Sequence, residues 1–364
     1  MEAKAAVMTE FNAPLEMQSF PLVPLEPGEV RVKITCAGVC GSDVHMWRGK
    51  DPRTPLPMIP GHEGVGEVTE IAGSKTDLFG RELKPGDPVL WERGVMCGDC
   101  YYCNIAKEPS LCPQRKTYGI SYSCEDPPHF LGCYSEYLHL RAGHPMIKLD
   151  LDVSHEVLVP ATCSGATAAH AVETSGLKPG NSAIVVGPGP VGLFVLAQLL
   201  DAGAGQVWIA GTAADKGRLK MAKEFGSAGV LNVDEMGKSE IEELVMDETR
   251  GQGPNVIMDC TGYAPVVNEW IDLLAPGGTY SIPGIATPQN EISLELFSTL
   301  ARKGARLQGV WVSDTSHLWR AANLVASGRF PFEKMITHKF SLEEATEGLK
   351  VTESKESIKA VLKP

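Results

Sequence analysis

Four cysteines crowd into residues 97–112, with the spacing Cys97-x2-Cys100-x2-Cys103-x8-Cys112. Four thiolates on one short loop can surround a zinc ion tetrahedrally. Such a site is closed, because no position remains for a substrate, so its metal would stabilise the fold. Four unrelated buried cysteines are the alternative, and the regular spacing argues against it.

A second set of metal-binding side chains is dispersed along the chain. Cys40 lies in Gly38-Val39-Cys40-Gly41-Ser42-Asp43, His62 in Gly61-His62-Glu63-Gly64, and Cys163 in Ala161-Thr162-Cys163-Ser164-Gly165. A lone cysteine or histidine is more often a core residue than a ligand. Only the residues that flank Cys40, His62 and Cys163 change that expectation.

A glycine-rich segment, Gly187-Pro188-Gly189-Pro190-Val191-Gly192, follows an apolar run and precedes a helical pattern. In that context the pattern is typical of a site for dinucleotide phosphates. Gly187 would permit the tight turn, Gly189 would let the backbone approach a pyrophosphate, and Gly192 would let helix and strand pack closely. The helix N-terminus would then meet the phosphates. A turn without a ligand is the alternative.

The next apolar run ends at Gly211, where dinucleotide-binding folds usually carry an acidic residue for the ribose. Without that carboxylate, a 2′-phosphate meets no repulsion, and Thr212, Lys216 and Arg218 could donate to it. Asp215 is a rival candidate, as a ligand of the 2′-hydroxyl. Solvated loop residues are the third interpretation. We expect NAD or NADP as cofactor, with a modest preference for NADP.

The glycine motif and the residues near Gly211 lie in a region where apolar strand patterns alternate with helical patterns. Strands are predicted at Ala183–Val186, Val207–Ala210, Val256–Asp259 and Gly278–Ile282, with helices ending near Ala202 and spanning Gly217–Phe225. The alternation predicts a doubly wound parallel sheet. The first 150 residues are β-rich, with a strand at Val30–Cys36. After residue 312 we expect a helix, a β-like segment at Met335–Phe340, and a final helix and strand.

Length and charge restrict the protein class. A chain of 364 residues predicts two domains, and its net charge of −12 argues against a nucleic-acid partner. Ala183–Leu200 is uncharged, but its glycines and prolines favour a strand, turn and buried helix over a membrane span. The first residues lack an apolar signal core. We therefore expect a cytoplasmic protein with no membrane partner and with reduced cysteines.

The chain resembles the medium-chain zinc-dependent alcohol dehydrogenases over essentially its whole length. Five features carry the resemblance: residues 37–43, residues 60–66, the cysteine loop, the glycine motif and Ile336-Thr337-His338. The resemblance implies a β-rich GroES-like catalytic domain at 1–163, a Rossmann coenzyme domain at 164–311, and a return to the catalytic domain at 312–364. One departure is the eight-residue gap before Cys112, where the family usually has seven residues.

The resemblance also assigns roles to single residues. Cys40, His62 and Cys163 would ligate a catalytic zinc, Glu63 would lie behind the metal, and Asp43 would fix the tautomer of His62. With the cysteine loop, this implies two zinc ions per chain. Ser42 and His45 would relay the alcohol proton. Further cofactor contacts would come from Pro190, Val191, Thr167, Thr261, Pro283, Ile285 and Lys359, the last in place of the usual arginine.

The implied reaction is hydride transfer between a small primary or secondary alcohol, or its aldehyde or ketone, and NAD(P). Arg93 could favour an anionic or very polar substrate. The alternatives are a polyol dehydrogenase, a zinc-free quinone or enoyl reductase, and a non-catalytic, zinc-stabilised nucleotide-binding protein. The family pairs subunits through edge strands, and Arg306–Val312 could supply one. We therefore expect a homodimer or homotetramer.

Overall fold

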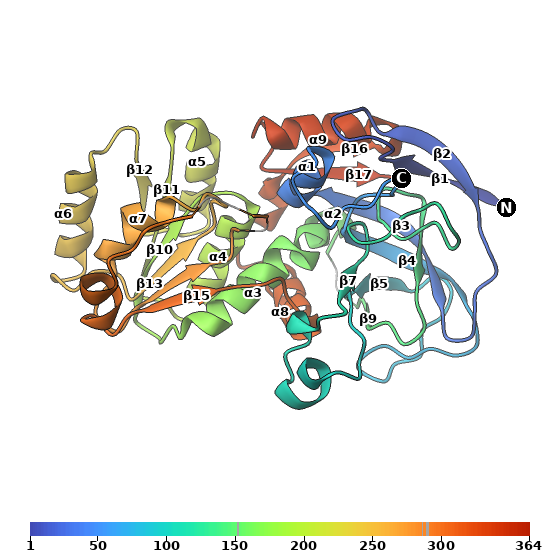
Figure 1. Ribbon diagram of the computed structural model, residues 1–364, viewed down its shortest axis with the longest axis horizontal. Coiled ribbons are helices and arrows are strands. Elements are labelled where there is room, and N and C mark those ends of the chain that lie inside the picture. The colour runs from blue at the N-terminus through green and yellow to red at the C-terminus, as the bar shows by residue number, and fades with distance from the viewer. Residues whose placement is uncertain (151–152, 286, 289–290) are drawn as a thin grey trace. The chain divides into compact units, whose positions relative to one another are not determined.

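The computed structural model describes residues 1–150, 153–285, 287–288 and 291–364. The chain divides into two compact units (Figure 1). The first comprises Met1–Cys163, Asp314–Ala326 and Phe332–Pro364, and the second comprises Ser164–Ser313 and Ser327–Pro331. The return to the first unit thus begins at Asp314, two residues after the expected position, and Ser327–Pro331 belongs with the second unit.

The first unit is built on a seven-stranded sheet with the order β16-β17-β3-β4-β5-β9, and β8 also pairs with β3. Two small antiparallel pairs, β1-β2 and β6-β7, accompany this sheet. The strands are β1 (Glu2–Val7), β2 (Glu16–Pro21), β3 (Val30–Val39), β4 (Glu63–Ile71), β5 (Pro88–Trp91), β6 (Gly94–Val95), β7 (Lys116–Thr117), β8 (Tyr137–Leu140), β9 (Met146–Lys148), β16 (Ile336–Ser341) and β17 (Lys359–Lys363).

The C-terminal segment completes this sheet. β17 pairs antiparallel with β3, so the last residues of the chain lie beside residues 37–39, as the red and blue arrows show in Figure 1. The helices of this unit are α1 (Gly41–Trp47), α2 (His155–Leu158), α8 (Thr315–Ala326) and α9 (Ala345–Glu353). Short turns of helix are η1 (Tyr102–Ala106), η2 (Pro109–Leu111), η3 (Val159–Thr162), η7 (Phe332–Met335) and η8 (Leu342–Glu344).

The second unit is a doubly wound parallel sheet with the order β12-β11-β10-β13-β14-β15. Its strands are β10 (Ser182–Val186), β11 (Gln206–Gly211), β12 (Gly229–Asn232), β13 (Val256–Asp259), β14 (Thr279–Ile282) and β15 (Arg306–Gly309). Helices precede or connect them: α3 (Ser164–Ser175), α4 (Pro190–Asp201), α5 (Lys216–Glu224), α6 (Lys238–Glu248) and α7 (Val266–Trp270), with short turns η4 (Ala213–Asp215), η5 (Ile271–Leu273) and η6 (Phe297–Ala301).

The predicted parallel sheet is therefore confirmed. The central strands β10 and β13 are buried along nearly their whole length, which explains why their sequences are continuous apolar runs. The sequence prediction did not include β12, α6 or α7. The uncharged segment 183–200 forms β10, a turn and most of α4, as expected. Among the described residues, no helix has the length and apolar character required to cross a membrane.

Candidate functional site

One buried carboxylate contacts two of the dispersed candidate metal ligands. Asp43 lies in the first turn of α1 and accepts a hydrogen bond from the backbone N–H of Cys40 at 2.8 Å. Its other oxygen accepts from Nδ1 of His62 at 3.0 Å. A proton on Nδ1 leaves Nε2 of His62 as the metal-binding atom. Asp43 therefore holds both Cys40 and His62, although it lies only three residues after Cys40 in the sequence.

Tyr134 is a further residue of this network, which the sequence prediction missed. Its hydroxyl donates to Oδ2 of Asp43 at 3.1 Å, and both side chains are buried. Tyr134 lies ninety-one residues from Asp43 along the chain. Nothing in the sequence pattern around Tyr134 indicated the contact, because it depends on how two distant loops approach each other.

Cys40, His62, Glu63 and Cys163 form one group, whose ligand atoms all lie within 4.8 Å of one another. Cys40 immediately precedes α1, His62 precedes β4, and Cys163 follows η3. His62 Nε2 is 3.3 Å from Cys163 Sγ. A hydrogen bond from Cys163 and the nearness of His62 lower the pKa of Cys40 well below its usual value, although burial opposes this. Two sulfur atoms and one imidazole at these separations fit a zinc ion.

Glu63, the fourth member of this group, forms an ion pair with Lys359. Lys359 Nζ is 2.5 Å from Glu63 Oε2, and both side chains are almost completely buried. Burial raises the pKa of Glu63 to about 7, although the positive charge of Lys359 opposes the shift. The predicted contact of Lys359 with a pyrophosphate remains a prediction, since the structure describes its interaction with Glu63.

The two predicted proton-relay residues share helix α1. Ser42 and His45 are partly buried, one turn apart. Burial lowers the pKa of His45 below its ordinary value of 6.5, and the charge of Lys50 acts in the same direction. A partly buried imidazole of this kind is neutral near pH 7 and can accept a proton.

The four cysteines of the loop also come together, with their sulfur atoms within 4.8 Å of one another. Sγ of Cys100 and Cys103 are 3.5 Å apart, as are those of Cys97 and Cys112. The long last gap forms η1 and η2, joined through Lys107 in a left-handed conformation. Cys112 joins the other three cysteines across this eight-residue gap.

The glycine motif forms the turn between β10 and α4. Gly187 has φ +96°, a conformation that glycine favours. A Cβ on Gly192 would lie 2.0 Å from the carbonyl oxygen of Gly187, so only glycine permits this approach of helix and strand. A Cβ on Gly189 would meet no atom within 4 Å, which leaves the backbone open on that side. Each glycine thus has the environment that its proposed role requires.

The other predicted cofactor residues gather at one edge of the coenzyme sheet. Gly211, Thr261 and Pro283 stand at or just beyond the carboxyl ends of β11, β13 and β14, and the glycine motif follows β10. Because these strands are parallel neighbours, their carboxyl ends meet at one edge. The chain turns in opposite directions on either side of β10 and β13, which is where such sheets bind ligands. Val191 and Pro190 lie in the first turn of α4, Ile285 follows Pro283, and Thr167 lies in α3.

The surroundings of Gly211 show how the residues of this loop are engaged. Asp215 Oδ2 accepts from the backbone N–H of Thr212 at 3.1 Å and from its hydroxyl at 2.7 Å. Arg218 lies 3.5 Å from the other oxygen. A Cβ on Gly211 would lie 2.9 Å from the ring of Pro188. The position therefore has no room for an acidic side chain without a shift of the turn, and Asp215 is engaged within its own loop.

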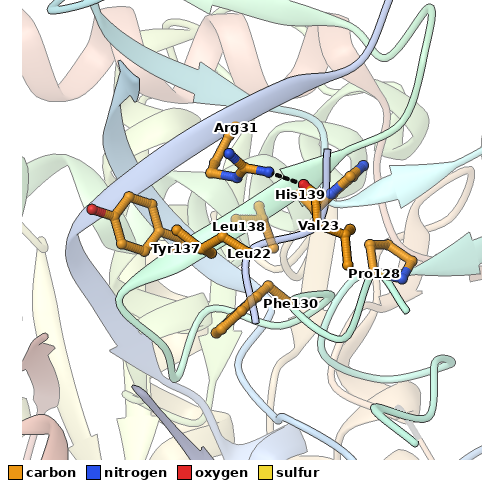
Figure 2. A pocket seen from close by; sticks show the side chains of 8 residues that line it. All are labelled: Leu22, Val23, Arg31, Pro128, Phe130, Tyr137, Leu138 and His139. Carbon is orange, nitrogen blue, oxygen red and sulfur yellow. Dashed lines mark hydrogen bonds between the residues drawn. The ribbon is translucent and has the colours of Figure 1, made fainter. Parts of the chain in front are cut away.

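A shallow hollow lies elsewhere in the first unit and contains none of the predicted site residues. Figure 2 shows Phe130 and Leu138 among the side chains that line it, with Arg31 bonded to the carbonyl of Val23. His139 is paired with Glu29 at 2.8 Å. The polar groups of the hollow are thus satisfied internally, and the metal-binding groups remain the better candidate for chemistry.

Comparison with known proteins identifies the family of this chain. Residues 26–150 match the alcohol dehydrogenase GroES-like domain, and residues 190–327 match the zinc-binding dehydrogenase domain. A sorbitol dehydrogenase of Halalkalibacterium halodurans is 30% identical over 92% of each chain. A 5-exo-hydroxycamphor dehydrogenase of Pseudomonas putida is 28% identical over 99% of this chain and 98% of its own.

Among solved structures, an alcohol dehydrogenase from Thermotoga maritima covers 100% of both chains with a TM-score of 0.96 and 42% identity. The relatives cover the chain almost completely, so both units and both cysteine-containing groups fall within the similarity. The chain belongs to the medium-chain zinc-dependent alcohol dehydrogenase family, and its activity is oxidoreduction between alcohols and their carbonyl compounds with NAD(P).

Proposed function

We propose that this dehydrogenase depends on zinc, binds two zinc ions per chain and prefers NADP. The observation that carries the zinc proposal is the group formed by Cys40, His62, Glu63 and Cys163, which three distant segments bring together. A bound zinc ion there would supply a Lewis acid for an alcohol or carbonyl oxygen. The cysteine loop offers a second, closed group of four sulfur atoms.

The protein's own residues would provide placement and proton transfer. Asp43 holds His62 and Cys40 by hydrogen bonds, and Tyr134 holds Asp43. Ser42 and His45 would pass the alcohol proton along α1. The hydride would go to the nicotinamide, whose dinucleotide would lie at the carboxyl edge of the coenzyme sheet.

Metal analysis together with an alcohol panel tests the proposal. Freshly purified protein should contain two zinc ions per chain and oxidise at least one primary alcohol, secondary alcohol or polyol with NAD(P). Polyols belong in the panel because one relative is a sorbitol dehydrogenase. Cys40→Ser should abolish turnover and retain the zinc of the cysteine loop. Activity that survives in Cys40→Ser would instead favour a zinc-free reductase, and no turnover on any substrate would favour a non-catalytic protein.

The cofactor proposal rests on the loop after β11. Gly211 carries no charge, Asp215 is bound to Thr212, and Lys216 is exposed at the start of α5. Asp234 accepts from the backbone N–H of Ala213 at 2.8 Å, but it is exposed and its charge is solvated. A phosphate bound by Lys216 would gain about 1.5–3 kcal/mol from one charge-assisted hydrogen bond. That energy corresponds to a preference of about ten- to a hundredfold.

Lys216→Met tests the cofactor preference better than a change at Gly211, which would displace Pro188. The variant should lose most of its kcat/KM with NADP and keep that with NAD. Lys220→Met, on an exposed position of the same helix, is the matched control and should change neither value. A parent enzyme that prefers NAD at least tenfold would contradict the proposal. Dependence of that preference on Asp215 would then identify the ribose ligand.

All ten cysteines are free of disulfides in the structure. Nine of them belong to the two candidate metal groups or lie buried in the first unit, where oxidation would remove ligands or require repacking. A reducing compartment preserves such thiols. We therefore propose the cytoplasm as the location. Loss of zinc and activity on mild oxidation in vitro, reversed by reductant and zinc, would support this requirement.

A further inference from the structure

Arg93 is a buried arginine that contacts one of the candidate zinc ligands. It follows the end of β5 by two residues, and its side chain is only 5% exposed. Nη1 of Arg93 donates to Sγ of Cys163. The same sulfur atom lies 3.3 Å from Nε2 of His62, inside the group of four ligand residues. The guanidinium therefore touches the ligand group through a sulfur atom.

The charges around Arg93 explain why it remains ionised there. An arginine side chain keeps its proton in proteins, and the negative charge of the neighbouring Glu92 acts on the guanidinium of Arg93. Glu92 is itself buried, accepts from the backbone N–H of Gly94 at 2.9 Å, and lies 3.5 Å from Arg115. A buried guanidinium is tolerated when it is paired in this way, because an uncompensated charge would cost several kcal/mol.

We infer that Arg93 is a positioning residue that holds the thiolate of Cys163 and draws electron density from it. Hydrogen bonds from a cation to an ionised acceptor are among the strong ones in proteins. Two thiolates and an imidazole leave zinc without net charge, which weakens it as a Lewis acid. A cation that donates a hydrogen bond to one sulfur atom withdraws some of the negative charge that this sulfur would give to the zinc. Groups that contact metal ligands adjust the electrophilicity of the metal in this way. The inference rests on the proposed zinc dependence.

This role differs from the expectation that Arg93 favours an anionic or very polar substrate. The guanidinium of Arg93 donates to Cys163, and the side chain is buried. A residue that binds substrate would change KM for anionic alcohols when it is substituted. A residue that acts through the ligand sulfur would change kcat for every alcohol and the electronic spectrum of a metal bound at that sulfur.

Cobalt-substituted protein provides the test, because a sulfur-to-cobalt charge-transfer band reports the electron density on the ligand sulfur. Arg93→Met keeps the length and apolar stem of the side chain and removes the cation. We expect the band to move to longer wavelength and kcat of the zinc enzyme to fall by about 10- to 100-fold. The zinc content should stay at two ions per chain, and chelator competition should show no weaker binding. Arg93→Lys should restore part of both the band position and kcat.

Arg115→Met is the matched control. It removes a second buried guanidinium, whose ion pair is with Glu92, and leaves both Arg93 and Glu92 in place, so the band should stay in the parent's position. An unmoved band in Arg93→Met would overturn the inference, as would loss of the zinc in step with kcat, which indicates a merely structural role. A rise in KM confined to anionic alcohols would also overturn it. The absence of zinc from the Cys40 group of the parent would be the separate failure of the proposed function.

Discussion

At the scale of single residues, the site depends on side chains that have several hydrogen-bonding partners. Asp43 accepts from Cys40, His62 and Tyr134, and is almost completely buried. A buried carboxylate with three donors loses little by leaving water, because each donor replaces a hydrogen bond to solvent. The same bonds fix the position of two ligands before any metal binds. Rigid partners of this kind explain how short ligand motifs from distant segments can form one centre.

His45 gives a prediction on pH dependence. Burial lowers its pKa below 6.5, so the imidazole stays neutral and able to accept a proton until the pH falls below that value. In His45→Gln this acceptor is missing. We expect kcat for alcohol oxidation near neutral pH to fall by about 100-fold, the low end for an acid–base group. The loss should shrink as rising pH supplies other acceptors.

Profiles of kcat between about pH 5 and pH 8 for both proteins check this prediction. The parent should lose activity only below pH 6.5, as His45 takes up a proton. If His45→Gln keeps the parent's rate and profile, the relay does not pass through this residue. Arg48→Gln, at the half-buried residue that caps the C-terminus of α1, is a control that should keep the parent's profile.

At the scale of elements, the cysteine loop lacks apolar packing of its own. No residue of η1 is buried, and Tyr101, Ile105 and Leu111 expose 63%, 70% and 42% of their surface. A segment with so few buried contacts cannot hold its conformation through the hydrophobic effect. We infer that metal binding stabilises it instead, in agreement with the closed geometry of four sulfur atoms.

Cys100→Ser should therefore lower both stability and zinc content. We expect one zinc ion per chain and a loss of about 3 kcal/mol, well below the about 10–16 kcal/mol that zinc gives to zinc-finger peptides. For a unit of this size the loss would lower Tm by roughly 6–12 °C. Cys124→Ala, at a buried cysteine outside both metal groups, should keep two zinc ions. A Cys100→Ser protein that melts like the parent would exclude a structural role for the loop.

The turn between β8 and β9 carries a second element-scale prediction. His144 is buried there and donates from Nε2 to the carbonyl of Glu92 at 2.5 Å. Burial lowers the pKa of His144 from 6.5 to about 4. Between pH 6.5 and pH 4, His144 binds a proton in the unfolded chain but stays neutral in the folded chain. The stability is therefore complete above pH 6.5 and declines as the pH falls from 6.5 towards 4.

At pH 5 this effect amounts to about 2 kcal/mol. His144→Gln can keep the hydrogen bond to Glu92 but has no proton to gain. Its loss of stability between pH 7 and pH 5 should be smaller than the parent's by about that amount. Urea unfolding at the two pH values measures the difference. Equal losses in parent and variant would show that His144 is not the group responsible.

At the scale of the whole molecule, the coenzyme sheet ends at β15, and the order of its strands leaves that edge without a further neighbour in the described chain. Leu307 and Trp311 in and after this strand are each 40% exposed. An exposed edge strand with apolar side chains invites pairing with another chain. We predict a homodimer, or a homotetramer of such dimers, joined through β15.

Light scattering at micromolar concentration should give the mass of two or four chains. Leu307→Asp places a charge in the proposed interface and should halve the mass, giving monomers if the parent is a dimer. Val233→Asp tests the opposite edge, because Val233 is 39% exposed just after β12. This control should assemble like the parent. A parent that is monomeric, or a Val233→Asp protein that alone dissociates, would contradict the proposed interface.

The sequence by itself determined the features that depend on neighbouring residues. Cys97, Cys100 and Cys103 follow one another on a single loop, so their spacing alone indicates a metal site. The glycines of residues 187–192 act within one turn. Strands such as β10 and β13 are apolar because both of their faces are buried. Short-range sterics and burial leave direct signatures in the chain. The ligand residues Cys40, His62 and Cys163 were found through the family's motifs, since no local pattern joins them.

Only the tertiary structure decided which distant groups touch. It paired Tyr134 with Asp43, Glu63 with Lys359, and Arg93 with Cys163. It also closed the space beside Gly211 with Pro188 and bound Asp215 to Thr212. These contacts arise from the packing of loops and strand ends whose separation in sequence carries no information about their separation in space. The chemistry of the ligands can thus be read from the chain, whereas their charge environment depends on how the chain folds.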